Sequence, residues 1–477
     1  MEAQQGRPAS MILPVRLGSG RILLVAAAAA LLLLGYALLL ELLADHDSDE
    51  LALSAAPDGG SHDAQHALSQ HALSETAHPD RGSSSALAKL LVLGVVVISA
   101  AGGIGGGGVI VPVLMLTDGM SAHGAIPLSK LTIFGNAICQ LLLNYRRRHP
   151  YVSDSLLIDY ESTLMFEPPT LLGTVFGVLL NRMSPQWLIN LLLLTFLSIT
   201  AGRTAQRGVA LYRRESAERA AIAYGRGKDA IVDPRTAAPA AAAGATAAAS
   251  VELQLPWKTL TILGLVWAHV LAASLVKRAT VCGSVGYWVT PLVLALVVGA
   301  VTLQTGRRLR KEHTARVALG HVYAPGQIQW GQKQVEQYPL LCLGAGILAG
   351  SLGVGGGMVM QPLMLELGML PEVASATAAF MMLFTASSTT AQFTLLGLVD
   401  WETNWPLVLI GAAGAYFGQR VIGRAMKASG GRQSLIVAPV ALIIGLSALL
   451  MVYVSSTNAM GPRMTGHTLE GFHGPCN

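Results

Sequence analysis

Two glycine-rich stretches inside apolar runs are the part of the chain whose residue types and spacing point to chemistry. Residues 102–112 read Gly-Gly-Ile-Gly-Gly-Gly-Gly-Val-Ile-Val-Pro, and residues 353–362 read Gly-Val-Gly-Gly-Gly-Met-Val-Met-Gln-Pro. Each glycine costs a helix about 1 kcal/mol relative to alanine, so a helix should break at both places. Within a membrane, unwound backbone persists only where it is buried in protein or lines a cavity. We therefore expect the two breaks to face each other.

A helix that restarts after a break presents unbonded N–H groups and the positive end of its dipole, and both suit an anion. We expect an anion site near the middle of the membrane, between broken helices that start at Gly103 and Gly353. The alternative is close helix packing through small residues, which is favoured for the isolated pair Gly173 and Gly177. The duplicated glycine runs favour the site. The expected backbone donors are Gly103, Gly105, Gly106, Gly107, Gly353, Gly355, Gly356 and Gly357.

Lys130 lies inside the next apolar segment, and Asn136 follows further along it. An ionisable side chain at membrane depth is costly and is by default a functional hypothesis. Lys130 could pair with the substrate or carry a proton, and the alternative is that it lies near enough to the segment end to reach the surface. At an offset of 250 residues its counterpart is Phe380, so the two halves of the chain are not chemically symmetric.

Hydroxyl side chains are expected to supply further neutral donors for the oxygen atoms of a ligand. Serine and threonine also form ordinary hydrogen bonds between membrane helices, and the sequence does not separate the two roles. The candidates are Ser129, Thr377, Thr385, Ser387 and Ser388.

The motif search argues against an enzyme, a cofactor and a metal site. The chain has no Gly-x-Ser-x-Gly, His-Glu-x-x-His or Walker sequence. The pattern Gly103-x-Gly105-x-x-Gly108 matches a dinucleotide loop but has no βαβ unit around it. The histidines of residues 44–86 favour a solvated linker over a metal site, and the four cysteines have no metal-like spacing. A membrane enzyme is the weakest alternative.

Composition indicates an all-α integral membrane protein that crosses the bilayer several times. Of 477 residues, 52% are hydrophobic and only 12% are charged, and the mean hydropathy is +0.52. Several apolar runs approach or exceed the roughly 20 residues that a spanning helix needs. The net charge of +5 comes from basic residues between apolar runs, which indicates membrane orientation and not nucleic-acid binding.

An internal repeat organises these segments. An offset of 250 aligns Pro112 with Pro362 together with the glycines before them, and an offset of 241 aligns residues 159–161 with 400–402. We predict about 10–11 transmembrane segments, built from two four-helix repeats with glycine-broken helices. The predicted order is a basic tail (1–21), a signal anchor or signal peptide (22–43), a His-rich polar segment (44–86), the first repeat (87–202), a polar and Ala-rich loop (203–255), two connecting spans (256–305), a basic loop (306–336), the second repeat (337–455) and a polar tail (456–477).

The sequence does not decide the orientation of the chain in the membrane. The basic stretches 146–148, 203–258 and 307–333 fall on one side, the cytoplasmic one, if every run crosses once. The basic residues of 420–432 then fall on the opposite side. A glycine-broken element that re-enters the membrane from one side would change this count.

The motifs of the second half resemble those of the sulfite exporter TauE/SafE family. They are Gly353-x-Gly355-Gly356-Gly357-x-x-x-x-Pro362, Leu365-Glu366-Leu367-Gly368, Ala376-Thr377 and Thr385-x-Ser387-Ser388. Leu128-Ser129-Lys130, Arg147-Arg148-His149-Pro150 and Ile158-Asp159-Tyr160 are similar to the longer plant and algal members, and the likeness covers roughly residues 87–454.

The resemblance implies a multi-pass permease that moves sulfite, sulfonates or related sulfur-containing anions by a proton-linked secondary mechanism. Members differ in substrate. The expected partners are a small anion, protons and the lipid bilayer, whereas the oligomeric state and the choice between plasma membrane and endomembrane stay undetermined. The alternative is an anion channel or a membrane-embedded sensor without coupled transport.

Overall fold

The structure is a computed structural model that describes residues 85–150, 155–223, 256–281, 284–320, 326–429 and 434–460. The predicted basic tail, signal segment and nearly all of the His-rich segment lie outside the described residues. The alanine-rich stretch of the predicted loop 203–255 and the end of the C-terminal tail lie outside them as well.

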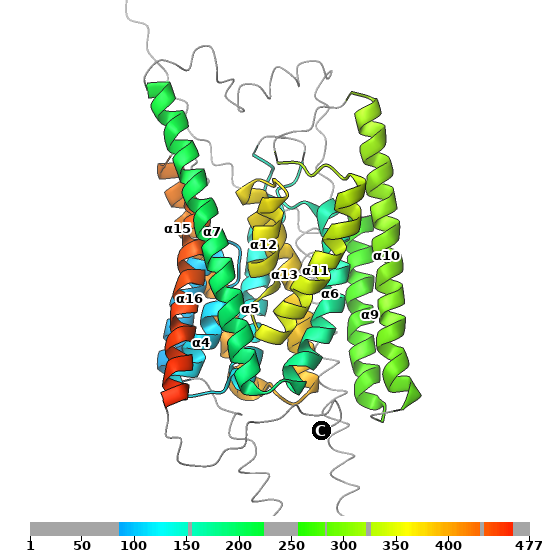
Figure 1. The fold of residues 1–477 in the computed structure, drawn as a ribbon, viewed down its shortest axis with the longest axis vertical. Helices are drawn as coiled ribbons and strands as arrows, with labels where there is room; N and C mark the ends of the chain where they lie inside the picture. Colours follow the sequence, from blue (N-terminus) through cyan, green and yellow to red (C-terminus); the bar gives the residue numbers. More distant parts are fainter. Residues whose placement is uncertain are drawn as a thin grey trace, which may run out of the picture. The chain divides into compact units, whose positions relative to one another are not determined.

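The described chain is helical, apart from one isolated bridge between Arg148 and Leu156 (Figure 1). The longer helices are α3 (Ala86–Ala101), α4 (Gly107–Thr117), α5 (Ala122–Asn144), α6 (Tyr160–Met183), α7 (Gln186–Ala223), α9 (Trp257–Ala279), α10 (Val285–Ala318), α11 (Gln332–Leu352), α12 (Gly356–Glu366), α13 (Pro371–Leu395), α15 (Pro406–Ala428) and α16 (Ser434–Met460), and the short α14 covers Trp401–Asn404. Seven of them are long and apolar enough to cross a membrane. The all-α, multi-pass membrane class is confirmed.

Both glycine-rich stretches break a helix, as predicted. The first break separates α3 from α4, and three of its glycines, Gly103, Gly105 and Gly106, have φ angles of 77°, 74° and 81°. The second break separates α11 from α12 and begins at Gly353, with φ of 70°. These left-handed conformations are open to glycine and costly for other residues, and they reverse the chain direction.

The first broken segment is a hairpin that enters and leaves at the same end of the helix bundle. The Ser85 N–H, at the start of α3, donates to the Asp118 carboxylate just after α4, at 3.2 Å. With 16 and 11 residues, α3 and α4 are about 24 and 16 Å long, against a hydrocarbon layer of about 30 Å. The segment therefore reaches into the bundle and returns, and we call α3, the break and α4 the first hairpin.

The second broken segment returns in the same way. A Cβ atom at Gly326, before α11, would lie 2.5 Å from Cγ of Leu370, just after α12. We call α11, the break and α12 the second hairpin.

The two hairpins enter from opposite ends of the bundle. Helix α5 starts just after the first hairpin, and α13 starts just after the second. The N–H of Asp159, beyond the far end of α5, donates to Thr377 Oγ1 in the first turns of α13, at 3.0 Å. The far end of α5 is therefore the end at which the second hairpin enters.

That end of the bundle collects basic residues, and we call it the basic end. It carries the stretch 146–148 after α5, and Arg207 of α7 pairs there with Glu366 at the end of α12. Arg219 of α7 donates to the carbonyl of Ser429 after α15 at 2.9 Å. Because both hairpins return to the end from which they enter, the end of α15 lies on the same side as the other basic segments. The basic residues of 420–432 therefore no longer fall on the opposite side, as they did when every apolar run was counted as one crossing.

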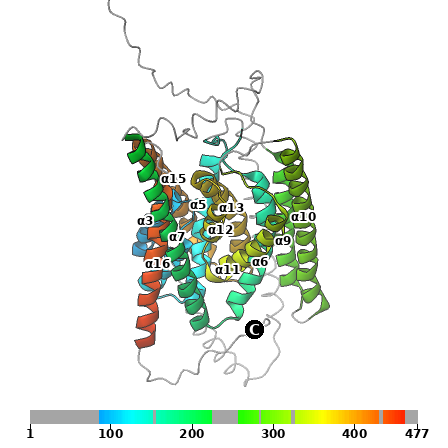
Figure 2. The ribbon, with the colours of Figure 1, turned by 45° about the horizontal axis from the view of Figure 1, so that its top comes forward.

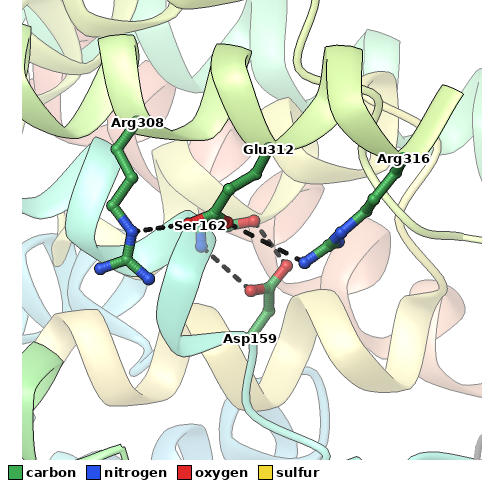
Figure 3. Close-up of polar contacts among 5 residues, drawn as sticks. All are labelled: Asp159, Ser162, Arg308, Glu312 and Arg316. Atoms are coloured by element: carbon green, nitrogen blue, oxygen red, sulfur yellow. Dashed lines mark hydrogen bonds and ion pairs between the residues drawn. The ribbon is translucent and has the colours of Figure 1, made fainter. Parts of the chain in front are cut away.

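Two segments predicted as loops continue as helices at the basic end. Helix α10 runs to Ala318 within 306–336, and α7 runs to Ala223 within 203–255. Figure 3 shows why α10 persists: Glu312 pairs with Arg308 at 2.7 Å and with Arg316 at 3.9 Å, each four residues away. The same view shows the Asp159 carboxylate accepting the Ser162 N–H at 3.0 Å, which caps the start of α6.

Small residues pack the hairpins against the crossing helices. Gly173 and Gly177 of α6 face α11, where an added Cβ would meet the carbonyl oxygens of Leu343 and Ile347. Figure 2 shows α6 and α11 side by side. This agrees with the packing interpretation given to the pair. Helices α5 and α13 pack together in the interior and are buried over most of their length.

Candidate functional site

The two breaks meet in the interior of the bundle. A Cβ atom at Gly107 would lie 2.5 Å from the carbonyl oxygen of Gly353, and one at Gly357 would lie 3.0 Å from that of Gly103. The offset of 250 residues converts the first contact into the second. Reciprocal contacts of this kind are what a local two-fold relation between two similar elements produces. The approach is close enough that a Cβ atom at Gly107 would clash with the opposite backbone and one at Gly357 would be tightly packed.

The helices restart later than the sequence suggested. Helix α4 begins at Gly107 and α12 at Gly356, not at Gly103 and Gly353. Left-handed φ angles at Gly103 and Gly353 keep both residues in the break. The N–H groups of Val109 and Met358 bond the carbonyls of Gly106 and Gly355, which leaves the N–H groups of the first two residues of each restarted helix, Gly357 among them, with no carbonyl of their own helix to bond. These are the groups that could bind an anion.

Two of the expected backbone donors are already bonded within the breaks. The Gly103 N–H donates to the Ala100 carbonyl at 3.2 Å, and the Gly355 N–H donates to the Gly353 carbonyl at 3.1 Å. Gly106 is the N-cap residue of α4 and makes no side-chain cap. The donor set is therefore smaller than predicted and is concentrated at the starts of α4 and α12.

Two apolar side chains fill the space between the breaks. Cδ1 of Ile133, from α5, would lie 3.1 Å from a Cβ atom at Gly355, and Sδ of Met382, from α13, would lie 3.4 Å from one at Gly357. Both side chains also abut Gly105. Ile133 and Met382 thus close the junction in this conformation.

Lys130 and Ser129 bond the end of α11 at the second break. The Lys130 side chain donates to the Ala349 carbonyl at 2.6 Å. Ser129 Oγ lies 3.1 Å from the Gly353 carbonyl oxygen and 2.8 Å from that of Ile126, so its single proton is shared between these two acceptors. Lys130 is 1% exposed, so it does not reach the surface as the alternative interpretation required. A cation at a helix C-terminus is favoured by the helix dipole. A buried basic group therefore stands beside the second break.

A neutral amide takes the corresponding place at the first break. Gln419 Nε2, from α15, donates to the Ala100 carbonyl at the end of α3, at 3.1 Å. The same group lies 3.3 Å from Gln140 Oε1, and Gln140 in turn donates to Asn136 Oδ1 at 2.9 Å. The predicted site residue Asn136 thus joins the first break through a chain of amides and does not touch it.

Of the predicted hydroxyls on α13, Thr385 lies at a break. Its Oγ1 would be 3.0 Å from a Cβ atom at Gly356. The other three bond elsewhere: Thr377 accepts from the Asp159 N–H at the basic end, Ser387 accepts from Trp267 Nε1 of α9 at 2.8 Å, and Ser388 accepts from Gln392 Nε2 at 3.0 Å. Ser129 and Thr385 are therefore the two hydroxyls that the fold brings to the second break.

A cavity of about 130 Å³ leads from the basic end towards the first break. Arg147 and Glu372 are among its lining residues, and so are Ser375 and Gln419. Ser375 also packs against Gly103, where an added Cβ would meet it, so one lining residue of the cavity contacts the break. Arg147 donates to Asn144 Oδ1 at 3.1 Å and supplies a positive charge on the way in.

Glu167 on α6 is a candidate that the sequence analysis missed. It is 0% exposed, and both carboxylate oxygens lack a hydrogen-bond partner in the described structure. The signal was available, because an acid between Phe166 and two prolines inside an apolar run meets the criterion applied to Lys130.

Comparison with known proteins gives one consistent family. The family model described as "Sulfite exporter TauE/SafE" matches residues 11–204, 88–245 and 220–451. Among curated proteins, Sulfite exporter TauE/SafE family protein 3 of Arabidopsis thaliana is 33% identical over 384 residues, which cover 77% of this chain and 78% of the relative. Family protein 1 of the same plant is 30% identical over 353 residues, covering 72% and 76%. No solved structure shows a significant match.

Proposed function

Because the chain belongs to the sulfite exporter TauE/SafE family of membrane transporters, we propose that it is a proton-coupled secondary transporter of small sulfur-containing anions, such as sulfite or organosulfonates. The observation that carries the proposal is the reciprocal contact of the two glycine breaks. In transporters, discontinuous helices from two repeats supply backbone groups to a shared site near the middle of the membrane. Here the starts of α4 and α12 would present their N–H groups to the anion.

Charge supports an anionic substrate. The Lys130 ammonium is buried beside the second break, and Ser129 and Thr385 place hydroxyls at the same break. Sulfite and sulfonate oxygens accept hydrogen bonds from N–H, O–H and ammonium donors alike. The names of the Arabidopsis relatives refer to sulfite export, which agrees with this set of hydrogen-bond donors.

Orientation follows from the basic residues. The positive-inside rule assigns the basic end to the cytoplasm. The cavity with Arg147 opens there, so an anion would enter from the cytoplasmic side and reach the first break through Ser375. Ile133 and Met382 would then have to separate for the anion to pass the junction.

Flux through proteoliposomes tests the proposal. The full chain is reconstituted and offered sulfite, sulfate, thiosulfate and taurine, with and without a pH difference. Gly356→Leu is expected to abolish flux, because its side chain would collide with Thr385 at the start of α12. Gly344→Leu is the matched control, since nothing lies within 4 Å of a Cβ atom there.

Unchanged flux in Gly356→Leu would contradict the site. Flux that only dissipates gradients and never accumulates the anion would identify a channel instead. Accumulation driven by the pH difference supports a coupled transporter.

A further inference from the structure

A buried acid without a partner is the strongest unexplained group in the molecule. Glu167 is 0% exposed on α6, and neither carboxylate oxygen is hydrogen-bonded in the described residues. An ionised carboxylate is very costly in such surroundings, so the neutral, protonated form is favoured. Ionisable residues inside membrane segments mark ion and proton pathways.

The contacts of α6 place Glu167 beside the second hairpin, nearer the basic end than the break itself. The two helices start together, where the Asp159 N–H donates to Thr377. They also end at the same level, because both ends contact the end of α9. The Leu395 carbonyl, in the last turn of α13, accepts a hydrogen bond from Arg278 at 2.9 Å, and the neighbouring Lys277 interacts electrostatically with Arg182, in the last turn of α6.

Parallel helices keep this register. Eight residues beyond Asp159 and Thr377 come Glu167 and Thr385, and Thr385 abuts Gly356 at the start of α12. Against α11, however, it is Asn181 that reaches the end of the helix, because its Nδ2 donates to the Ser351 carbonyl at 2.7 Å. Glu167 lies about 21 Å before Asn181 along α6, and it is therefore level with Cys342 in the middle of α11.

Glu167 also lies on the face of α6 that meets α13. Tyr160 is seven residues earlier, hence on the same face of the helix, and its ring centroid is 5.1 Å from that of Phe380. Thr170 and Thr174, three and seven residues further on, contact Gly346 and Gly350 of α11, so the carboxyl group lies between α11 and α13.

Few other titratable groups face this position. From α11 the buried Cys342 lies in electrostatic range of Glu167, and α13 carries no titratable residue after Glu372. From α9 the one titratable residue between Lys258 and Lys277 is His269, two residues from Trp267, which bonds Ser387.

Helix α10 places its charges elsewhere. It meets α6 through Gly306 beside Met165, and its charged residues Arg308, Glu312 and Arg316 interact with Glu161, nearer the basic end. The other cations of α10, Arg307, Arg310 and Lys311, are exposed, and none of them bonds the Glu167 carboxyl oxygens.

Lys130 is a further fully buried ionisable group beside the second hairpin. Its partner Ala349 lies seven residues beyond Cys342 on α11, about 10 Å along the helix axis. Glu167 and Lys130 thus approach the same hairpin from α6 and from α5.

We propose that Glu167 is the proton-binding residue of the transport cycle, an inference that rests on the proposed function. When Glu167 holds its proton, the Lys130 charge is uncompensated and the site attracts an anion. When the carboxyl O–H bond breaks and the proton passes to water on the release side, the negative carboxylate, roughly 10 Å from Lys130 along α11, lowers the positive potential at the site and the anion is released. Proton and anion therefore move in the same direction.

The transport test compares Glu167→Gln with Glu161→Gln in proteoliposomes. Glutamine keeps the neutral shape of the protonated acid but cannot release a proton, and Glu161 is an exposed acid on the same helix. The probes are sulfite and ethanesulfonate, the latter a monoanion at every pH used. With one proton per monoanion, a gradient of one pH unit supports about tenfold accumulation.

The expected result is about tenfold accumulation for the wild type and for Glu161→Gln, and none for Glu167→Gln. Exchange of internal for external anion is expected to persist in Glu167→Gln, which shows that the variant is folded. Wild-type accumulation by Glu167→Gln would overturn the proposal.

Infrared difference spectroscopy of the reconstituted chain tests Glu167 without any flux. The C=O stretching band of a protonated carboxylic acid is expected at neutral pH, and it should be missing in Glu167→Gln and retained in Glu161→Gln. Absence of this band from the wild type would overturn the assignment of the proton. If the band is present but neither anion is transported, the proposed function fails while the protonated state of Glu167 stands.

Discussion

The two hairpins share a backbone plan but differ in charge. At the end of α3 the Ala100 carbonyl is bonded by the neutral amide of Gln419, whereas at the end of α11 the Ala349 carbonyl is bonded by the ammonium of Lys130. The acid Glu167 also lies level with the second hairpin. The positions that correspond to Lys130 and Glu167 in the other half are the apolar Phe380 and Val408.

This difference separates two requirements of a transporter. A near-symmetric backbone lets two hairpins enter from opposite ends and meet at one place, and under the proposed function this would form a site reachable from both sides. Ionisable side chains beside the second hairpin alone would then make that site respond to ions. We therefore expect equivalent substitutions in the two halves of the chain to lower anion flux by different amounts but to destabilise the fold by similar amounts.

The largest effect is expected from the charge itself. Lys130→Met removes a hydrogen bond from a charged donor, worth about 1.5–3 kcal/mol, so anion flux should fall about 10–100-fold. Gln419→Leu removes the neutral bond at the first break, worth about 0.5–1.5 kcal/mol, and should lower flux about 2–10-fold. Initial uptake rates at matched protein content measure both, and equal losses would show that the hairpins contribute alike.

Packing should respond equally in the two halves. A Cβ atom at Gly177 would meet the Ile347 carbonyl, and one at Gly418 would meet the Val97 carbonyl, positions related by the offsets of 241 and 250. Each alanine substitution is expected to destabilise the fold by about 2–3 kcal/mol through overpacking. Thermal unfolding of the solubilised chain measures this, with Gly344→Ala as the control at an open position. A clear difference between the two variants would argue against matched packing.

The smallest effect should appear at the junction, where the reciprocal contacts are similar but not identical. Gly107→Ala would bring Cβ to 2.5 Å from the Gly353 carbonyl, against 3.0 Å from the Gly103 carbonyl for Gly357→Ala. We expect a loss of about 2 kcal/mol for Gly107→Ala and about 1 kcal/mol for Gly357→Ala. Thermal unfolding of the two variants measures both losses of stability. A larger loss for Gly357→Ala than for Gly107→Ala would contradict the order expected from the two distances.

The sequence predicted the helices and the breaks because both leave local signals. Apolar runs of membrane length define helices, and consecutive glycines such as Gly105 to Gly108 weaken them wherever they occur. The approach of the two breaks was also predicted, because duplicated broken segments in a membrane have few other ways to bury their backbone.

The direction of the broken segments was not predictable in this way. Hydropathy counts apolar length and does not say whether a chain crosses or returns, and that was decided by contacts such as Ser85 with Asp118. The helix starts were misplaced for a related reason. Gly103 and Gly353 adopt left-handed angles that terminate α3 and α11, and glycine composition alone does not tell the end of one helix from the start of the next.

The side-chain part of the site was the least predictable. Helix α13 is buried around most of its circumference, so no polar face indicates which hydroxyl meets which neighbour. Thr385 lies at the second break, whereas Ser387 accepts a hydrogen bond from Trp267 of α9. Glu167 was not predicted. The acids at the start of its helix are explained by a capping role, and no such explanation applies to an acid in the middle of the helix.

The hydrogen bond between Gln419 and the end of α3 has a consequence for biosynthesis. The two bonded residues are 319 positions apart, so the first hairpin cannot complete its packing until most of the chain has left the ribosome. At about 5–20 residues per second this delay is roughly 15–60 s. During that interval a half-length helical hairpin with an unwound tip has to be sheltered in the membrane, by the insertion machinery or by a chaperone.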